Sequence, residues 1–154
     1  MDLAIREGQV AEIARLETSI PEFTRPKTLD QLEQRLQAGR GALILVACDG
    51  QRPVAFKAGY ALAQDTFYSW VGAVLPGYRR AGIARKLLHG QEDRLRKTGH
   101  RRIRVKSRNA FPGMLRLLLG EGYRIVALEP VPSAEDPKVV FEKILLATRH
   151  EALR

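Results

Sequence analysis

The segment from Thr66 to Thr98 constrains the fold more than any other part of this sequence. It opens with a long strand rich in aromatic residues, Thr66–Leu75, which Pro76-Gly77 stops. A helix with regularly spaced apolar residues follows from about Ile83 to Thr98, and a further apolar alternation comes after it. Residues 67–107 therefore predict a strand–helix–strand unit with one parallel strand pair and a right-handed crossover.

The segments on either side predict a mixed sheet around this unit. Alternating or short apolar runs indicate further strands at Leu3–Arg6, Ala42–Cys48, Val54–Leu62, Tyr123–Leu128 and Val139–Leu146. Helical spacing marks Val10–Leu16, Thr28–Gly39 and Gly113–Glu121, and Thr28 with Gln31 forms a capping-box pattern. This order predicts an α/β (α+β) fold with a mixed, mostly antiparallel central sheet of about seven strands, flanked by four helices.

The bulk composition fits one globular domain over residues 1–154. Hydrophobic residues make up 45% of the chain, which is enough for a core. No apolar run approaches the ~20 residues of a membrane span, and the N-terminal residues do not resemble a signal peptide. The single Cys48 is expected in the core, and the histidines have no ligand-spaced partners, so no metal is expected. We expect a cytoplasmic protein that does not bind membranes.

The positive charge of this basic protein is concentrated in one stretch. The net charge is +9, and residues 78–108 hold 12 Lys and Arg against two acidic residues, so this stretch carries +10 and the remainder −1. Such a stretch indicates an anionic partner, which is a cofactor phosphate, a nucleic acid or an acidic protein. A solvated basic face explains most of the charges between Arg94 and Arg104 equally well.

The loop that enters the central helix is suited to bind phosphate. The first amides of a helix have no partner within the helix and carry the positive end of its dipole. Gly82 allows the backbone to approach a ligand closely, and Ala84 keeps the next turn narrow. Further positive charge comes from Arg79, Arg80 and Arg85. An ordinary strand-to-helix turn explains the same residues, so this pattern alone leaves both interpretations open.

The sequence around this loop resembles a known family. The run Arg79-x-x-Gly82-x-Ala84 is similar to the Q/R-x-x-G-x-G/A motif of the GCN5-related N-acetyltransferases, the GNAT superfamily. Val74 and Pro76 precede the run as in that family. Asn109 and Gly122-Tyr123 resemble its asparagine and its closing glycine–aromatic pair. The predicted order of elements matches the family's fold from residue 3 to about residue 146.

The resemblance implies an N-acetyltransferase that uses acetyl-CoA as its co-substrate. A primary amine of a small molecule or protein would attack the thioester directly. Pantetheine would lie between two diverging strands, bonded by the backbone of Val74 and reached by Asn109. The pyrophosphate would lie beside Arg79 on the loop amides of Arg80, Ala81, Gly82, Ile83, Ala84 and Arg85. A homodimer through the terminal strands is also common in the family.

Two positions depart from the family pattern. Many relatives have a tyrosine four residues before the glycine–aromatic pair, as the acid for the leaving thiolate, and Leu118 stands there. Some relatives have a glutamate as general base where Arg104 stands. The remaining catalytic candidates are Tyr68 and Ser69, which would order a water that takes the amine proton. The alternative is that Tyr68 only packs on one face of the sheet.

Two other classes of function stay open at this point. The basic stretch allows a nucleic-acid-binding or ribosome-binding module, although no helix-turn-helix or RNP-type pattern accompanies it. The missing tyrosine and glutamate allow an acetyl-CoA sensor without catalysis. The sequence does not identify the acceptor, and we expect the acidic loop Glu129–Asp136 over its mouth.

Overall fold

The computed structural model describes residues 1–38, 40–132 and 136–146. The strands are β1 (Leu3–Glu7), β2 (Arg40–Asp49), β3 (Arg52–Ala61), β4 (Thr66–Val74), β5 (Arg102–Arg108), β6 (Arg124–Glu129) and β7 (Lys138–Ile144). The helices are α1 (Val10–Thr18), α2 (Leu29–Ala38), α3 (Ile83–Lys97) and α4 (Pro112–Gly120), and a short 3-10 turn, η1 (Pro76–Tyr78), precedes α3.

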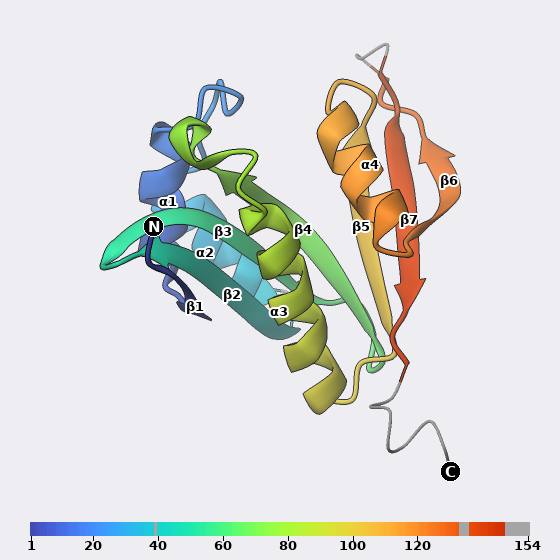
Figure 1. The fold of residues 1–154 in the computed structure, drawn as a ribbon. Helices are drawn as coiled ribbons and strands as arrows, with labels where there is room; N and C mark the ends of the chain where they lie inside the picture. Colours follow the sequence, from blue (N-terminus) through green and yellow to red (C-terminus); the bar gives the residue numbers. More distant parts are fainter. Residues whose placement is uncertain (39, 133–135, 147–154) are drawn as a thin grey trace.

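These elements form one sheet with helices on both faces. The strand order is β1-β2-β3-β4-β5-β7-β6. Only β4 and β5 pair in parallel, and all other neighbours are antiparallel. Helices α3 and α4 lie in front of the sheet in Figure 1, and α1 and α2 lie behind it. The predicted fold class and the predicted parallel pair are therefore confirmed.

Strands β4 and β5 separate halfway along their length. They pair only from Thr66 with Arg102 to Ser69 with Val105, whereas β4 continues to Val74. At the point of separation the register between β3 and β4 shifts, and Trp70 has no partner in β3. An extra residue of this kind bends a strand and increases its twist. The two halves of the sheet diverge beyond this bulge, as Figure 1 shows.

Two hydrophobic clusters correspond to the two halves of the sheet. The first packs β1–β4 against α1, α2 and the first turns of α3, and it includes Cys48, which is buried as predicted. The second packs β5 and β7 against α4 and the later part of α3. Leu87 belongs to the first cluster and Leu88 to the second, so α3 bridges both halves.

Local signals placed several element ends correctly. Thr28 and Gln31 form the predicted capping box, with the Thr28 amide 2.9 Å from Gln31 Oε1 and the Gln31 amide 3.2 Å from Thr28 Oγ1. The predicted hairpin joins β2 and β3 at Gly50. Strand β2 begins two residues earlier than expected, at Arg40. Among the described residues, no helix has the length and apolar character needed to cross a membrane.

Candidate active-site cleft

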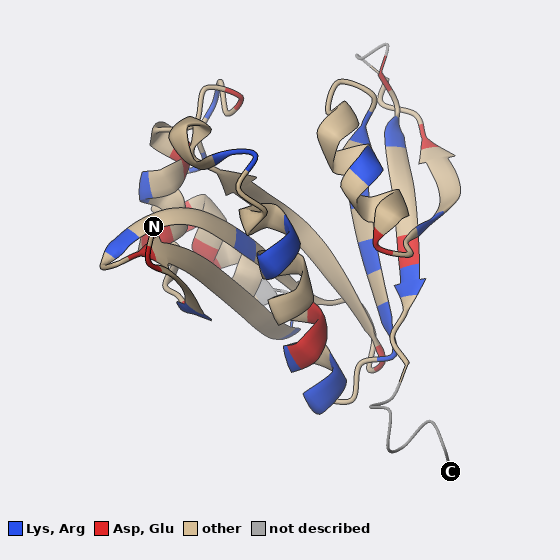
Figure 2. Ribbon diagram, viewed as in Figure 1, with Lys and Arg blue, Asp and Glu red and all other residues tan. Residues whose placement is uncertain are grey.

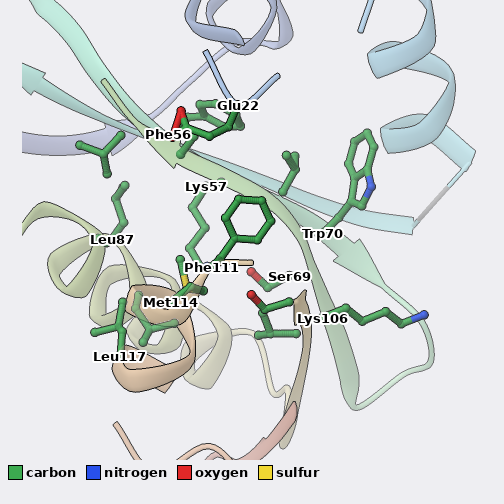
Figure 3. Close-up of a pocket in the computed structure, with 18 of the residues that line it drawn as sticks. Glu22, Phe56, Lys57, Ser69, Trp70, Leu87, Lys106, Phe111, Met114 and Leu117 are labelled. Carbon is green, nitrogen blue, oxygen red and sulfur yellow. The ribbon is translucent and has the colours of Figure 1, made fainter. Parts of the chain in front are cut away.

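The gap between β4 and β5 is part of a cleft of about 590 Å³. One wall, which we call the helix-side wall, faces α3 and α4 and includes Lys57, Leu87, Leu88, Met114 and Leu117. The other, the loop-side wall, includes Glu22, Phe23, Phe56, Tyr68, Trp70 and Lys106. Figure 3 shows both walls. The cleft therefore passes through the sheet where the bulge opens it.

The loop before α3 presents unsatisfied backbone amides. Helix α3 begins without a side-chain cap, and Gly82 at its N-cap has φ +77°. Arg80 also has a positive φ, +64°, which is uncommon for a residue with a side chain. Alternating left-handed and ordinary residues turn successive amides toward one point and form an anion-binding nest. A Cβ on Gly82 would meet nothing within 4 Å, so the backbone conformation, not lack of space, favours glycine.

Arg79 is held at the rim of the cleft by two neighbours. Its Nε donates to the carbonyl of Val74 at 3.2 Å, and its guanidinium forms an ion pair with Glu22 at 2.8 Å. The hydrogen bond from Arg79 lowers the pKa of Glu22. Arg79 therefore ties the end of β4 to the connection between α1 and α2. Tyr78 anchors the loop further by donating to Asp49 Oδ2 at 2.9 Å.

The structure brings together some of the predicted cofactor residues and separates others. Val74, Arg79 and Ala84 line the cleft. Ile83 is buried in the first cluster, and Arg85 pairs with Glu121 at 2.9 Å. The remaining loop residues, Arg80, Ala81 and Gly82, are exposed.

Asn109 lies beside the cleft without lining it. It stands between Arg108 and Phe111, which do line the cleft, and its amide donates to Asp136 Oδ1 at 3.2 Å. The Ala110 amide donates to the same carboxylate at 3.0 Å. These amides lower the pKa of Asp136. The part of the acidic loop over residues 133–135 lies outside the described residues.

Tyr68 and Ser69 both line the cleft but on opposite faces of β4. The Tyr68 ring packs edge-on against Tyr60, with centroids 5.7 Å apart, and Lys106 Nζ lies 5.5 Å from its centroid. Burial raises the pKa of Tyr68, so its phenol stays protonated at neutral pH. Ser69 Oγ is buried and has no hydrogen-bond partner among the described residues.

Neither of the two positions that depart from the family pattern lines the cleft. Arg104 is bound to Glu142 on β7, with both nitrogen–oxygen distances under 3 Å: 2.8 Å from Nε and 2.6 Å from Nη2. Leu118 is 0% exposed and belongs to the second cluster. The residues of α4 that line the cleft are Gly113, Met114 and Leu117. None of these carries a dissociable proton, so α4 offers no acid.

Sequence reasoning did not single out Lys57, a charged residue that lines the cleft. It is only 8% exposed and lies in the middle of β3. Burial lowers its pKa to about 8, and the charge of Glu92 opposes that shift. A single charged residue inside the apolar run Val54–Leu62 was the available signal. Lysine is almost never fully buried without a partner, so such an interruption indicates a special environment.

Several basic side chains of residues 78–108 form ion pairs with acidic residues of the same chain. Arg96 pairs with Asp93 and Glu92, Arg102 and Arg104 with Glu142, and Lys106 with Glu129. Figure 2 shows the basic and acidic segments together along α3 and across β5 and β7. These charges therefore have acidic partners within the fold, whereas Lys97 and Arg101 are exposed.

Residues 9–119 match the family model of the acetyltransferase (GNAT) family. The chain belongs to this family. The predicted resemblance is thereby confirmed, and the protein is an acetyltransferase by family. No curated protein matches it in sequence.

Solved structures share this fold at low sequence identity. Ard1 from Thermoplasma volcanium is 18% identical with a TM-score of 0.80, covering 95% of this chain and 99% of that one. The ribosomal-protein-S18-alanine N-acetyltransferase from Escherichia coli is 17% identical with a TM-score of 0.80, covering 96% and 97%. A GNAT family acetyltransferase from Elizabethkingia anophelis, solved with acetyl-CoA bound, is 17% identical with a TM-score of 0.72, covering 94% and 99%.

Proposed function

We propose that residues 1–154 form a single N-acetyltransferase domain that transfers the acetyl group of acetyl-CoA to a primary amine of a small molecule or protein. The observation that carries this proposal is the separation of β4 from β5 beyond Ser69 and Val105, next to the uncapped start of α3. A strand-like ligand arm fits the first feature, and a pyrophosphate fits the second.

In this proposal the cofactor enters from the helix side. The pyrophosphate lies on the amides from Arg80 to Arg85, where the dipole of α3 and the nest favour negative charge. The pantetheine arm follows β4 into the gap, within reach of the Val74 backbone. Asn109, next to the cleft, stays a predicted contact of that arm.

The acceptor approaches from the loop-side wall. There Phe23 and Trp70 form an apolar surface, and Lys27 Nζ lies 5.2 Å from each ring centroid. The neutral amine attacks the carbonyl carbon of the thioester, and an oxyanion forms. The carbon–sulfur bond then breaks, releasing the amide and coenzyme A. A backbone amide aimed at the oxyanion contributes ~3 kcal/mol to such a step.

No nucleophile of the protein is needed for this reaction. Cys48 is buried in the first cluster and does not line the cleft. Ser69 lies at the closed end of the gap, where its hydroxyl can order a water that takes the amine proton. Tyr68 is less suited to this role because its ring packs edge-on against Tyr60.

Calorimetric titration with acetyl-CoA, coenzyme A and ATP tests the proposal first. We expect micromolar binding of acetyl-CoA and little binding of ATP. An amine panel, followed by the release of free thiol, then tests catalysis. Absence of acetyl-CoA binding contradicts the proposal, and binding without turnover of any amine favours a sensor. Salt-sensitive RNA binding without acetyl-CoA binding favours the nucleic-acid alternative.

A further inference from the structure

A charged side chain, Lys57, lies on the helix-side wall among mostly apolar residues such as Leu87, Met114 and Leu117. Lys57 of β3 pairs across the strands with Gly72 of β4. Its neighbour Phe56 faces the other side of the sheet and stacks on Phe23, with ring centroids 6.4 Å apart. Because side chains alternate along a strand, Lys57 faces α3 and α4. Figure 3 shows it directed toward the side of the cleft that carries Leu87 and Met114.

Gly72 gives the lysine a path into the gap between the strands. The position that a Cβ of Gly72 would occupy lies 3.4 Å from Lys57 Cγ. The aliphatic stem of Lys57 therefore lies beside a residue of β4 that has no side chain. Gly72 is three residues past Ser69, where β4 has already left β5.

The ammonium of Lys57 has no compensating contact. No hydrogen bond or ion pair joins it to any described residue. Glu92 on α3 is the acidic group that acts on it, and Glu92 already accepts from Tyr123 at 2.7 Å and from Lys143 at 3.1 Å. Leu45 faces it from β2, and no titratable residue of α4 lines the cleft. The other basic residues along the same cleft are Arg79, Lys106, Arg108 and Lys138.

Placing a lysine in a largely buried position without an ion pair is costly, whereas a methionine of similar length packs there without that cost. The charge is therefore explained by a ligand that supplies a negative atom at this place. With the pyrophosphate at α3 and the arm in the gap, the proposed function puts the sulfur of the cofactor inward of Val74, along the part of β4 that includes Gly72. That sulfur becomes negative as the acetyl group leaves.

We propose that Lys57 is the general acid of the reaction, donating its proton to the sulfur of coenzyme A as the carbon–sulfur bond breaks. This inference rests on the proposed function. The attacking amine loses its own proton to water, and Lys57 is reprotonated from solvent after coenzyme A leaves. The sum is one amine and one acetyl thioester converted into one amide and one thiol.

The pKa values of the Lys57 ammonium and of a thiol are similar. A thiol has a pKa of ~8.5, and burial lowers the pKa of Lys57 to about 8. Proton transfer between groups of similar pKa is nearly balanced in energy, and most Lys57 side chains still carry the proton at pH 7. Lys57 thus supplies the acid that α4 does not provide.

The pKa of bound coenzyme A tests the inference without turnover. The ultraviolet absorbance of the thiolate is followed against pH in the complex with wild-type protein and with Lys57→Met. We expect wild type to hold the thiol pKa below that of free coenzyme A, and Lys57→Met to raise it by about one unit or more. Lys97→Met removes an equal charge at the exposed end of α3 and should leave the thiol pKa at the wild-type value.

Kinetics give the second readout. We expect Lys57→Met to lower kcat by roughly 10²–10⁴-fold, the usual contribution of a positioned acid, with the acetyl-CoA Kd within about threefold of wild type. The fall of kcat/KM for acetyl-CoA above pH of about 8 should disappear in this variant. Lys57→Arg keeps a positive charge but cannot donate a proton at these pH values, so it should not restore the rate.

Three results overturn the inference. They are an unchanged thiol pKa in Lys57→Met, full activity of Lys57→Arg, or an acetyl group found by mass spectrometry on Lys57, which would make it a nucleophile. Failure of the proposed function looks different, because wild type then binds no acetyl-CoA or acetylates no amine. If wild type binds coenzyme A without acetylating any amine, the thiol pKa still decides the role of Lys57.

Discussion

The polar groups on the two walls of the cleft differ in whether they have hydrogen-bond or ion-pair partners. On the helix-side wall, Lys57 is 8% exposed and forms no hydrogen bond or ion pair with a described residue, and the buried Ser69 hydroxyl has no partner among them. On the loop-side wall, Lys106 pairs with Glu129 at 2.9 Å and Glu22 with Arg79 at 2.8 Å. The groups of the loop-side wall are also closer to solvent.

The paired residues of the loop-side wall stabilise the free protein, whereas Lys57 and Ser69 have no such pairing and are available to a ligand. A paired charge near the surface is satisfied in the free protein and contributes ~0–1 kcal/mol to stability. An unpartnered buried group costs more than that and recovers the cost only when a partner arrives. This contrast supports our proposal that the helix-side wall receives the reacting part of acetyl-CoA and that the acceptor approaches from the loop-side wall.

The largest expected effect concerns the phosphate loop at the entrance of the helix-side wall. Replacing Gly82 with Glu places a carboxylate beside the pyrophosphate and strains a left-handed residue, so we expect about a 1,000-fold loss of acetyl-CoA affinity, or ~4 kcal/mol. Calorimetry measures it. Gly50→Glu is a matched control, because Gly50 also has a positive φ and open space but lies in the β2–β3 turn. If Gly82→Glu retains micromolar affinity for acetyl-CoA, the pyrophosphate does not bind at this loop.

The stability of Lys57→Met sharpens the contrast between the walls. Burial lowers the pKa of Lys57 from 10.5 to about 8, so the folded state disfavours the proton by ~3 kcal/mol at pH 7. Between pH of about 8 and 10.5 the unfolded chain binds this proton more strongly, and wild type gains stability as the pH rises. We expect Lys57→Met to be more stable at pH 7 by up to that amount, with the gap closing toward pH 10.5 in denaturant titrations. A constant gap, or a less stable variant, contradicts the unpaired buried ammonium.

Two neighbouring leucines of α4 test where the helix-side wall ends. Leu118 is fully buried, so Leu118→Tyr should overpack the second cluster and cost ~1–3 kcal/mol of unfolding free energy. Leu117 lines the cleft, and Leu117→Tyr should cost less than ~1 kcal/mol. Thermal or denaturant unfolding of both variants measures the difference. Equal costs would mean that α4 is rotated relative to the cleft.

The smallest effect is expected on the loop-side wall. Lys106→Met removes the ion pair with Glu129. The Lys106 side chain is 24% exposed and the Glu129 side chain 46% exposed, so the free energy of unfolding should change by less than ~1 kcal/mol. The pKa of Glu129, which Lys106 lowers, should rise toward its ordinary value. The acetyl-CoA Kd should stay within about twofold. Tenfold weaker binding of acetyl-CoA would show that the loop-side wall also contributes to cofactor binding, which would contradict the proposed difference between the two walls.

The sequence by itself determined the order of elements, the fold class and the family, and it predicted where a phosphate-binding loop would lie. These follow from short-range signals: the periods of apolar residues, the capping box of Thr28 and Gln31, and the run from Arg79 to Ala84. Such signals involve residues within one or two helical turns, whose geometry is set before the chain packs.

Only the tertiary structure decided which side chains share the cleft. Lys57 faces the gap because the register of β3 and β4 sets it opposite Gly72, and the bulge at Trp70 opens β4 away from β5. Arg104 meets Glu142, 38 residues away, through the pairing of β5 with β7. A one-residue change in strand register or a rotation of a helix exchanges the facing residues while the local pattern stays the same. For that physical reason the periodicity predicted the strand that contains Lys57 but not the role of its charge.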